Sequence, residues 1–104
     1  FKNYVVRTIG GISKRASNQT LDKYVRLVNN AENLFGPLAG KSVLEIGCDP
    51  NGNFLKYLCS TRSVGPAIGV NPCLTANIES SEFTLLKADA RNLPFADNSI
   101  DAIL

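Results

Sequence analysis

The segment from residue 43 to residue 52 places an acid, a glycine and a tight turn one after another, in the order Val-Leu-Glu-Ile-Gly-Cys-Asp-Pro-Asn-Gly. A carboxylate such as that of Glu45 accepts hydrogen bonds from hydroxyl or amino groups. A glycine such as Gly47 lets backbone approach a ligand closely. Residues 53–58 have the pattern of the first turns of a helix. Strand, tight loop and helix start together form an arrangement that seats nucleotide-like ligands, so we expect a ligand site here.

The cysteines and the missing histidines narrow the chemistry that this chain can perform. The sequence contains three cysteines, Cys48, Cys59 and Cys73, and no histidine. An odd number of cysteines without Cys-x-x-Cys spacing indicates neither a disulfide framework nor a zinc site. Without histidine, Ser-His and Cys-His schemes of nucleophilic catalysis are excluded. We therefore expect free thiols in a reducing compartment and no bound metal.

Length, composition and charge indicate one small soluble domain. The chain has 104 residues, of which 44% are hydrophobic, and 11 basic residues stand against 9 acidic ones. This mild balance argues against a dedicated nucleic-acid surface. No apolar run approaches the roughly 18 residues of a membrane span, and no secretory signal is recognisable.

The charge is uneven along the chain, because residues 1–20 carry four basic side chains and no acid. We interpret residues 1–19 as a basic flexible arm and residues 20–104 as the folded part. The expected location is the cytoplasm, with the mitochondrial matrix as the alternative because targeting peptides are also basic. The first residue is Phe1 rather than Met, which indicates a processed or partial chain.

Helices and strands alternate after the basic arm. An apolar stripe at three- and four-residue steps predicts a helix that starts at Thr20 and stops at Gly36-Pro37; its members are Leu21, Tyr24, Val25, Val28, Ala31 and Phe35. Further along, we expect strands at 43–46, 67–70, 83–88 and 100–104, a short helix at 53–60, at most a weak helix at 74–80, and a loop at 89–99.

This alternation is typical of an α/β protein with a parallel sheet. Right-handed crossovers would place the second and third strands successively on one side of the first strand and the fourth strand on its other side. Ligands of such sheets bind outside the carboxyl ends of the strands where the order reverses. Those ends carry Glu45 to Gly47, Asn71 and Asp89, so we expect these three positions to converge.

Three segments, Val43 to Cys48, Ile68 to Pro72 and Leu86 to Leu104, together resemble the class I S-adenosylmethionine-dependent methyltransferases. The similarity is greatest to the small-molecule methyltransferases of type 11 and covers about residues 20–104. Each segment alone is a weak signal. The resemblance rests on all three occurring in the right order and at the right separations. The resemblance implies a Rossmann-like three-layer α/β/α fold, of which this chain is the N-terminal part, and S-adenosyl-L-methionine as the cofactor.

The resemblance also implies roles for individual residues. Glu45, Gly47 and Cys48 stand where the family positions the methionyl part and the ribose. Asn71 stands where the family has an acid that accepts both ribose hydroxyls. Asp89 matches the acid that accepts from the adenine amino group, and the Ala90 N–H matches the donor to the ring.

Two positions depart from the family pattern. Asp49 replaces a glycine of the common Gly-x-Gly-x-Gly loop, so that bulk and negative charge lie near the cofactor's carboxylate or, alternatively, near its sulfonium. Asn71 replaces a carboxylate, and because charge-assisted hydrogen bonds are roughly twice as strong as neutral ones, weaker cofactor binding is expected.

The leading hypothesis is the cofactor-binding half of a methyltransferase that acts on an unidentified acceptor, with a small molecule favoured. The alternative is a truncated or degenerate relative that keeps the fold as a non-catalytic binding module. A dinucleotide-binding Rossmann enzyme is the third hypothesis, but its Gly-x-Gly-x-x-Gly fingerprint is not met because Asp49 occupies the second glycine position. Acceptor-binding and catalytic residues of the family usually lie at the end of the fourth strand or later, so no catalytic residue is named.

Overall fold

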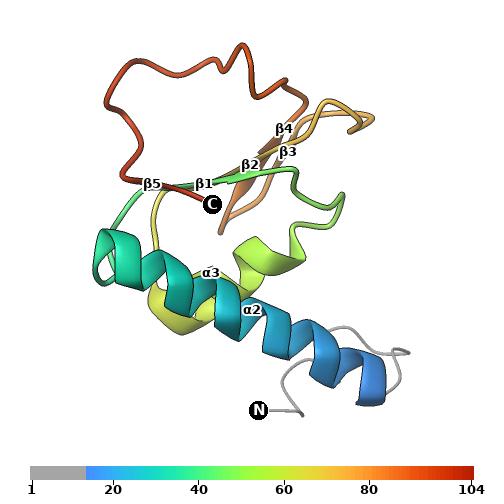
Figure 1. Cartoon of the computed structure of the whole chain (residues 1–104). Helices are drawn as coiled ribbons and strands as arrows, with labels where there is room; N and C mark the ends of the chain where they lie inside the picture. The colour runs from blue at the N-terminus through green and yellow to red at the C-terminus, as the bar shows by residue number, and fades with distance from the viewer. Residues whose placement is uncertain (1–13) are drawn as a thin grey trace.

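The computed structural model describes residues 14–104 (Figure 1). Its elements are, in chain order, α2 (Lys14–Phe35), β1 (Val43–Ile46), α3 (Asn53–Arg62), β2 (Ala67–Val70), β3 (Ile78–Glu79), β4 (Thr84–Leu86) and β5 (Ala102–Ile103). The strands form one sheet in the order β3-β4-β2-β1-β5. Strands β4, β2, β1 and β5 are parallel to their neighbours, and only β3 is antiparallel. The predicted reversal of strand order at β1 is therefore confirmed.

Helix α2 is longer than its apolar stripe predicted. It begins at Lys14, whereas the expected start was Thr20, so the last part of the predicted arm is helical. The rest of that arm, residues 1–13, lies outside the described residues. Leu21, Val28 and Ala31 of the stripe are buried, as predicted, but its last member, Phe35, is 37% exposed.

Helix α3 lies between two residues with left-handed backbone, a conformation in which a helix cannot continue. Gly52 before the helix has φ +64°, and Ser63 after it has φ +52°. The helix buries Phe54, Leu55, Tyr57 and Leu58. It extends two residues beyond the predicted end at residue 60.

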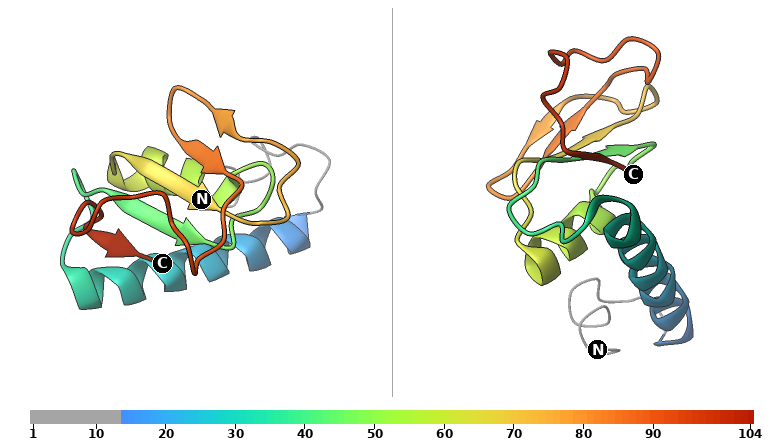
Figure 2. Two further views of the ribbon diagram at one scale, coloured as in Figure 1. Left: turned by 90° about the horizontal axis from the view of Figure 1, so that it is seen from above. Right: turned by 60° about the vertical axis from the view of Figure 1, so that its left-hand side comes forward.

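The main core lies between the sheet and the two helices, which cover the same face of the sheet (Figures 1 and 2). Val43, Ala67 and Ala102 are register neighbours on β1, β2 and β5, and all three belong to this core. Side chains alternate between the faces of a strand, so Glu45, two residues after Val43, also faces the helices. The fold is a partial Rossmann-like α/β fold, with the described helices on one face only.

The opposite face of the sheet is covered partly by the loop that connects β4 to β5. Leu44 is fully buried on this side, whereas Ile46 is 39% exposed and Ile103 is 53% exposed. Figure 2 shows this loop crossing the sheet on the side away from α2 and α3. Within residues 14–104, no helix of the second outer layer that the resemblance implies is present.

The prediction of at most a weak helix at residues 74–80 was wrong. Residues 78 and 79 form β3, which pairs with β4 in a short hairpin. Ser80 closes the turn: its N–H donates to the Phe83 carbonyl (2.9 Å), and its Oγ accepts from the Phe83 N–H (3.1 Å). Pairing with β4 thus supplies the backbone hydrogen bonds that a two-residue strand cannot make by itself.

Two side-chain clusters fix the ends of the elements. Asp101 Oδ2 accepts from the Ser42 N–H (2.9 Å) and from Ser42 Oγ (3.0 Å), which ties the start of β5 to the start of β1. Glu32 accepts from the Leu38 N–H (3.0 Å) and from Arg62 Nε (3.2 Å), which ties the end of α2 to the end of α3. Neither described helix is long and apolar enough to cross a membrane.

Candidate functional site

A cavity of about 250 Å³ lies where β1 ends, between α2 and the start of α3. It contains the acid and the glycine that the sequence singles out. Its lining residues are Lys23, Tyr24, Leu27, Glu45, Gly47, Asp49, Asn53 and Phe54. The carboxyl end of β1, the first turn of α3 and the middle of α2 thus surround one space.

Glu45 is the most electrostatically unusual residue of this cavity. Burial, followed by the nearby charge of Asp49, raises the pKa of its carboxyl from 4.5 to about 7, and Lys23 partly opposes this shift. Its Oε1 atom is buried and has no hydrogen-bond partner. A buried acceptor without a partner is costly, so it marks a place where a ligand group or a water molecule can donate.

Gly47 gives the cavity an open stretch of backbone. Its φ of +79° is one that residues with a side chain rarely adopt, and no atom beyond its two chain neighbours lies within 4 Å of the place where a Cβ would be. The Gly47 N–H donates to the Val70 carbonyl (2.8 Å), which anchors the loop to β2. Both the conformation and the free space suit a ligand that lies against the chain.

Cys48 is a fully buried packing residue. A Cβ placed on Gly69 of β2 would lie 2.7 Å from the Cβ of Cys48 and 2.9 Å from its Sγ, so the cysteine fills the space that this glycine leaves. Burial, with the charges of Glu45 and Asp49, raises the pKa of the Cys48 thiol to about 11. Little thiolate is therefore present at neutral pH, and Cys48 is a poor nucleophile in the folded protein.

Asp49 lines the cavity, and its carboxylate is already engaged by the loop itself. Oδ1 accepts from the Asn53 N–H (2.9 Å), and Oδ2 accepts from the Asn51 N–H (3.2 Å). The Asp49 carbonyl also accepts from the Gly52 N–H (3.2 Å). These contacts show how a loop with aspartate in place of glycine closes into a turn.

Asn71 connects the end of β2 to the same loop. Its Nδ2 donates to the Cys48 carbonyl (2.9 Å), and its Oδ1 accepts from the Cys73 N–H (2.8 Å). The Asn71 N–H donates to the Leu86 carbonyl (3.1 Å), so the ends of β2 and β4 meet here. Asn71 is not among the residues that line the cavity around Glu45.

Asp89 follows the end of β4 by three residues and pairs with Arg91. Its Oδ2 is 2.6 Å from Nη2 of Arg91, and its Oδ1 is 3.0 Å from Nε of the same side chain. These bonds lower the pKa of the Asp89 carboxyl. The Arg91 side chain is 89% exposed, so the pair is weak and can be opened by a competing donor. Ala90, between the two, is exposed.

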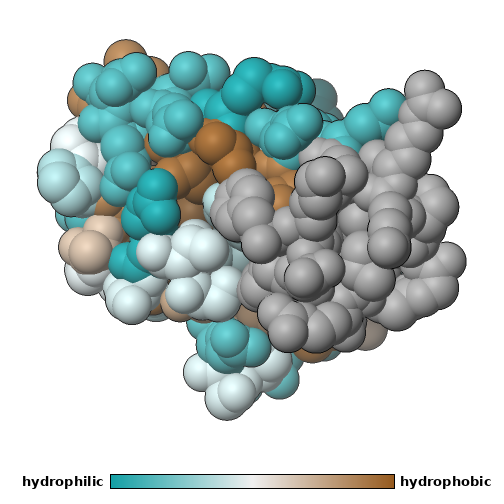
Figure 3. All heavy atoms as spheres, turned by 90° about the horizontal axis from the view of Figure 1, so that it is seen from below, coloured by the Kyte–Doolittle hydropathy of each residue, from teal (hydrophilic) through white to brown (hydrophobic). Residues whose placement is uncertain are grey.

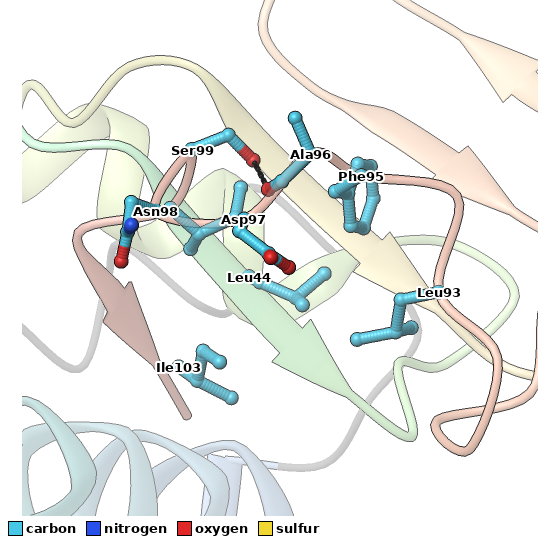
Figure 4. A pocket seen from close by; sticks show the side chains of 9 residues that line it. Leu44, Leu93, Phe95, Ala96, Asp97, Asn98, Ser99 and Ile103 are labelled. Atoms are coloured by element: carbon cyan, nitrogen blue, oxygen red, sulfur yellow. Dashed lines mark hydrogen bonds between the residues drawn. The ribbon is translucent and has the colours of Figure 1, made fainter.

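A second cavity of about 360 Å³ lies on the other face of the sheet (Figure 4). Figure 4 shows Leu44 of β1 and Ile103 of β5 beside side chains of the β4–β5 loop, in which Ser99 Oγ donates to the Ala96 carbonyl (2.7 Å). The lining residues are Leu44, Leu93, Phe95, Ala96, Asp97, Asn98, Ser99, Ile100 and Ile103. Asp97 is the single ionisable residue among them, so this cavity offers less chemistry than the smaller one.

The helical side of the molecule contributes residues that the sequence analysis did not assign to the site. Figure 3 shows this side, where hydrophilic residues border an apolar area. Lys23 and Tyr24 of α2 line the cavity together with Phe54 of α3, and the Tyr24 and Phe54 ring centroids are 5.2 Å apart. Tyr24 was predicted only as part of the apolar stripe. The sequence signal was a basic residue next to an aromatic one, Lys23 and Tyr24, in the helix that precedes the strand with Glu45.

The residues at the end of β1 fit a cofactor that combines cationic groups with hydroxyl groups. Glu45 offers a buried free acceptor, and Gly47 offers exposed backbone with room beside it. Asn71 fits less well, because each end of its amide already has a protein partner, although an amide oxygen has a second lone pair. No three His, Cys, Asp or Glu side chains of residues 14–104 are grouped so as to hold a metal ion.

A mostly parallel sheet, with an acid and a glycine loop at the end of its first strand, places the chain in the class of Rossmann-like α/β folds. A family model described as "Methyltransferase domain" matches residues 44–104. This match spans more than half of the chain, and the chain belongs to this methyltransferase family. The searches of curated proteins and of solved structures found no match.

Proposed function

We propose that this chain is the cofactor-binding part of an S-adenosylmethionine-dependent methyltransferase whose acceptor is a small molecule. The observation that carries the proposal is the cavity at the end of β1, in which the unpartnered Oε1 of Glu45 lies near the open backbone of Gly47. The bound cofactor would supply a methyl group on a positively charged sulfonium. The family match to residues 44–104 supports the same reaction class.

Each group of the protein has a defined task in this proposal. Glu45 accepts a hydrogen bond from the amino-acid end or the ribose of the cofactor, and its ionised form favours a cationic ligand. Gly47 lets the cofactor lie against the loop. Asp89 accepts from the adenine amino group after its exposed pair with Arg91 opens, and the Ala90 N–H donates to the ring.

Equilibrium dialysis with radiolabelled S-adenosylmethionine tests the proposal on the full chain. The wild-type chain should bind the cofactor, and Gly47→Ala should weaken binding at least about tenfold because its Cβ occupies the ligand's space. Gly40→Ala is the matched control: Gly40 has φ +74° and free space for a Cβ, so it imposes the same backbone strain away from the cavity.

The outcomes separate the two functions under consideration. Loss of binding in Gly47→Ala with binding kept in Gly40→Ala supports the cofactor site. Absence of binding by the wild-type chain favours the alternative, a non-catalytic binding module with the same fold. The engagement of Asp49 and Asn71 with the protein itself is the observation that gives this alternative weight.

A further inference from the structure

Two residues that depart from the family's sequence pattern hold the loop after β1 from opposite sides. Asp49 contacts the part of the loop that leads into α3, and Asn71 contacts the part that leaves β1. Between them lie Gly47, with its open backbone, and the buried Cys48. The side chain of each residue makes hydrogen bonds to two backbone groups.

Asp49 does the work of a helix cap. Gly52, the residue before α3, has no side chain to accept from the first N–H groups of the helix. The carboxylate of Asp49 accepts instead from the N–H of Asn53, the first residue of α3, and also from the N–H of Asn51 in the turn before it. A negative charge at this end of a helix is also favoured by the helix dipole. The start of α3 is thereby fixed without help from a ligand.

Asn71 does something that an aspartate at the same place cannot do. Its Nδ2 donates to the Cys48 carbonyl while its Oδ1 accepts from the Cys73 N–H. A carboxylate keeps the second contact but has no hydrogen for the first, and its oxygen would face the carbonyl oxygen of Cys48. The amide is therefore matched to this loop, and a carboxylate is not.

We infer that Asp49 and Asn71 are positioning residues that brace the cofactor loop, residues 47–53, in its binding shape before a ligand arrives. The inference rests on the proposed function, because it takes this loop as the cofactor loop. It assigns Asn71 to the loop rather than to direct recognition of the ribose. It also gives one explanation for the two residues that differ from the family pattern: Asp49 and Asn71 together hold a loop that has fewer glycines.

The first arm of the test follows the loop itself and needs no cofactor. Alkylation of Cys48, resolved from Cys59 and Cys73 by mass spectrometry, reports opening of the loop because Cys48 is fully buried. Hydrogen exchange of the Asn53 amide reports the cap. Asn71→Asp and Asp49→Ala should each accelerate the local readout about 10- to 100-fold, as expected when a partly buried backbone group loses its hydrogen-bond partner.

Two further variants guard against a general loss of stability. Asn77→Asp is the matched control for Asn71→Asp: Asn77 Oδ1 accepts from the Lys87 N–H (2.7 Å), a contact that an aspartate retains, so no change is expected. Asp49→Asn keeps one acceptor oxygen and should restore part of the protection lost in Asp49→Ala. Exchange of the β2 amides serves as the reference for global unfolding. Unchanged loop readouts, or an acceleration equal to that of the β2 amides, would overturn the inference.

The second arm measures S-adenosylmethionine affinity by titration calorimetry. A positioning role predicts that Asn71→Asp binds about tenfold more weakly, although it restores the carboxylate that the resemblance implies. Tighter binding by Asn71→Asp would overturn the inference, because it would show direct contact with the ribose. If the wild-type chain binds no cofactor, the proposed function fails, and the first arm alone decides whether the loop is braced.

Discussion

Replacing Glu45 with glutamine should remove a pH dependence of stability that the buried carboxylate creates. Its pKa is raised from 4.5 to about 7, so the folded protein favours the protonated form more than the unfolded chain does. The contribution to stability is then fully present below pH 4.5, falls as the pH rises, and is lost above about pH 7. Glu45→Gln keeps the shape of the side chain and has no proton to lose.

The magnitude follows from the size of the shift. A change of about 2.5 pKa units corresponds to about 3 kcal/mol, and partial contact with water reduces this to about 2 kcal/mol. The wild-type free energy of unfolding should therefore fall by about 2 kcal/mol between pH 4.5 and 8, while that of Glu45→Gln stays nearly constant. The chain contains no histidine that would titrate in this window.

Urea denaturation of the full chain at pH 5, 6, 7 and 8 measures these values. Lys23→Gln is the companion variant: Lys23 lowers the pKa of Glu45, so its loss should steepen the fall and move it to higher pH. A flat wild-type profile, or one with the same slope in Glu45→Gln, would refute the reasoning. It would mean that the Glu45 carboxylate finds a partner or water in the folded protein.

Three further predictions concern packing and charge elsewhere in the fold. Gly69→Ala should destabilise the protein by about 1–3 kcal/mol in urea denaturation, because the new Cβ would lie 2.7 Å from the Cβ of Cys48. In native protein at pH 8, Cys73 should react with iodoacetamide at least about 100-fold faster than Cys48, whose burial and pKa of about 11 leave little accessible thiolate; equal rates would contradict this. Hydrogen bonds from Ser42 lower the pKa of Asp101, so this carboxylate contributes its full stability above its unfolded pKa and loses it as the pH falls through its lower folded pKa. Melting temperatures between pH 3 and 6 should show a smaller acid-induced decrease in Asp101→Asn than in the wild type.

Much of the sheet could be predicted because its strands are short apolar runs bounded by turn residues. Val43–Ile46 and Ala67–Val70 were predicted with the observed ends, and handedness alone placed the later strands on the correct sides of β1. The β3 hairpin could not be predicted in this way. Ile78 and Glu79 are both exposed and have no periodic pattern, so only pairing with β4 makes them a strand.

The chemistry of the site depended on contacts between distant residues, which a sequence pattern does not contain. The pattern singled out Glu45, but its raised pKa arises from burial in a cavity lined by Lys23 and Tyr24 of α2, about twenty residues earlier in the chain. Asp49 was expected to project charge toward the cofactor, and its two hydrogen bonds to the loop depend on the turn geometry. The bridging contacts of Asn71 depend on how closely β1 and β2 lie side by side.

The contact between Cys48 and Gly69 has a consequence for how this protein can change over evolution. The cysteine occupies space that exists only because the facing residue of β2 lacks a side chain. A larger residue at either position would push the cofactor loop away from the strand that anchors it. Among relatives of this chain, positions 48 and 69 should therefore vary together, with a small residue at one wherever the other is large. Such covariation would be evidence from sequences alone that the side chain at position 48 packs against position 69.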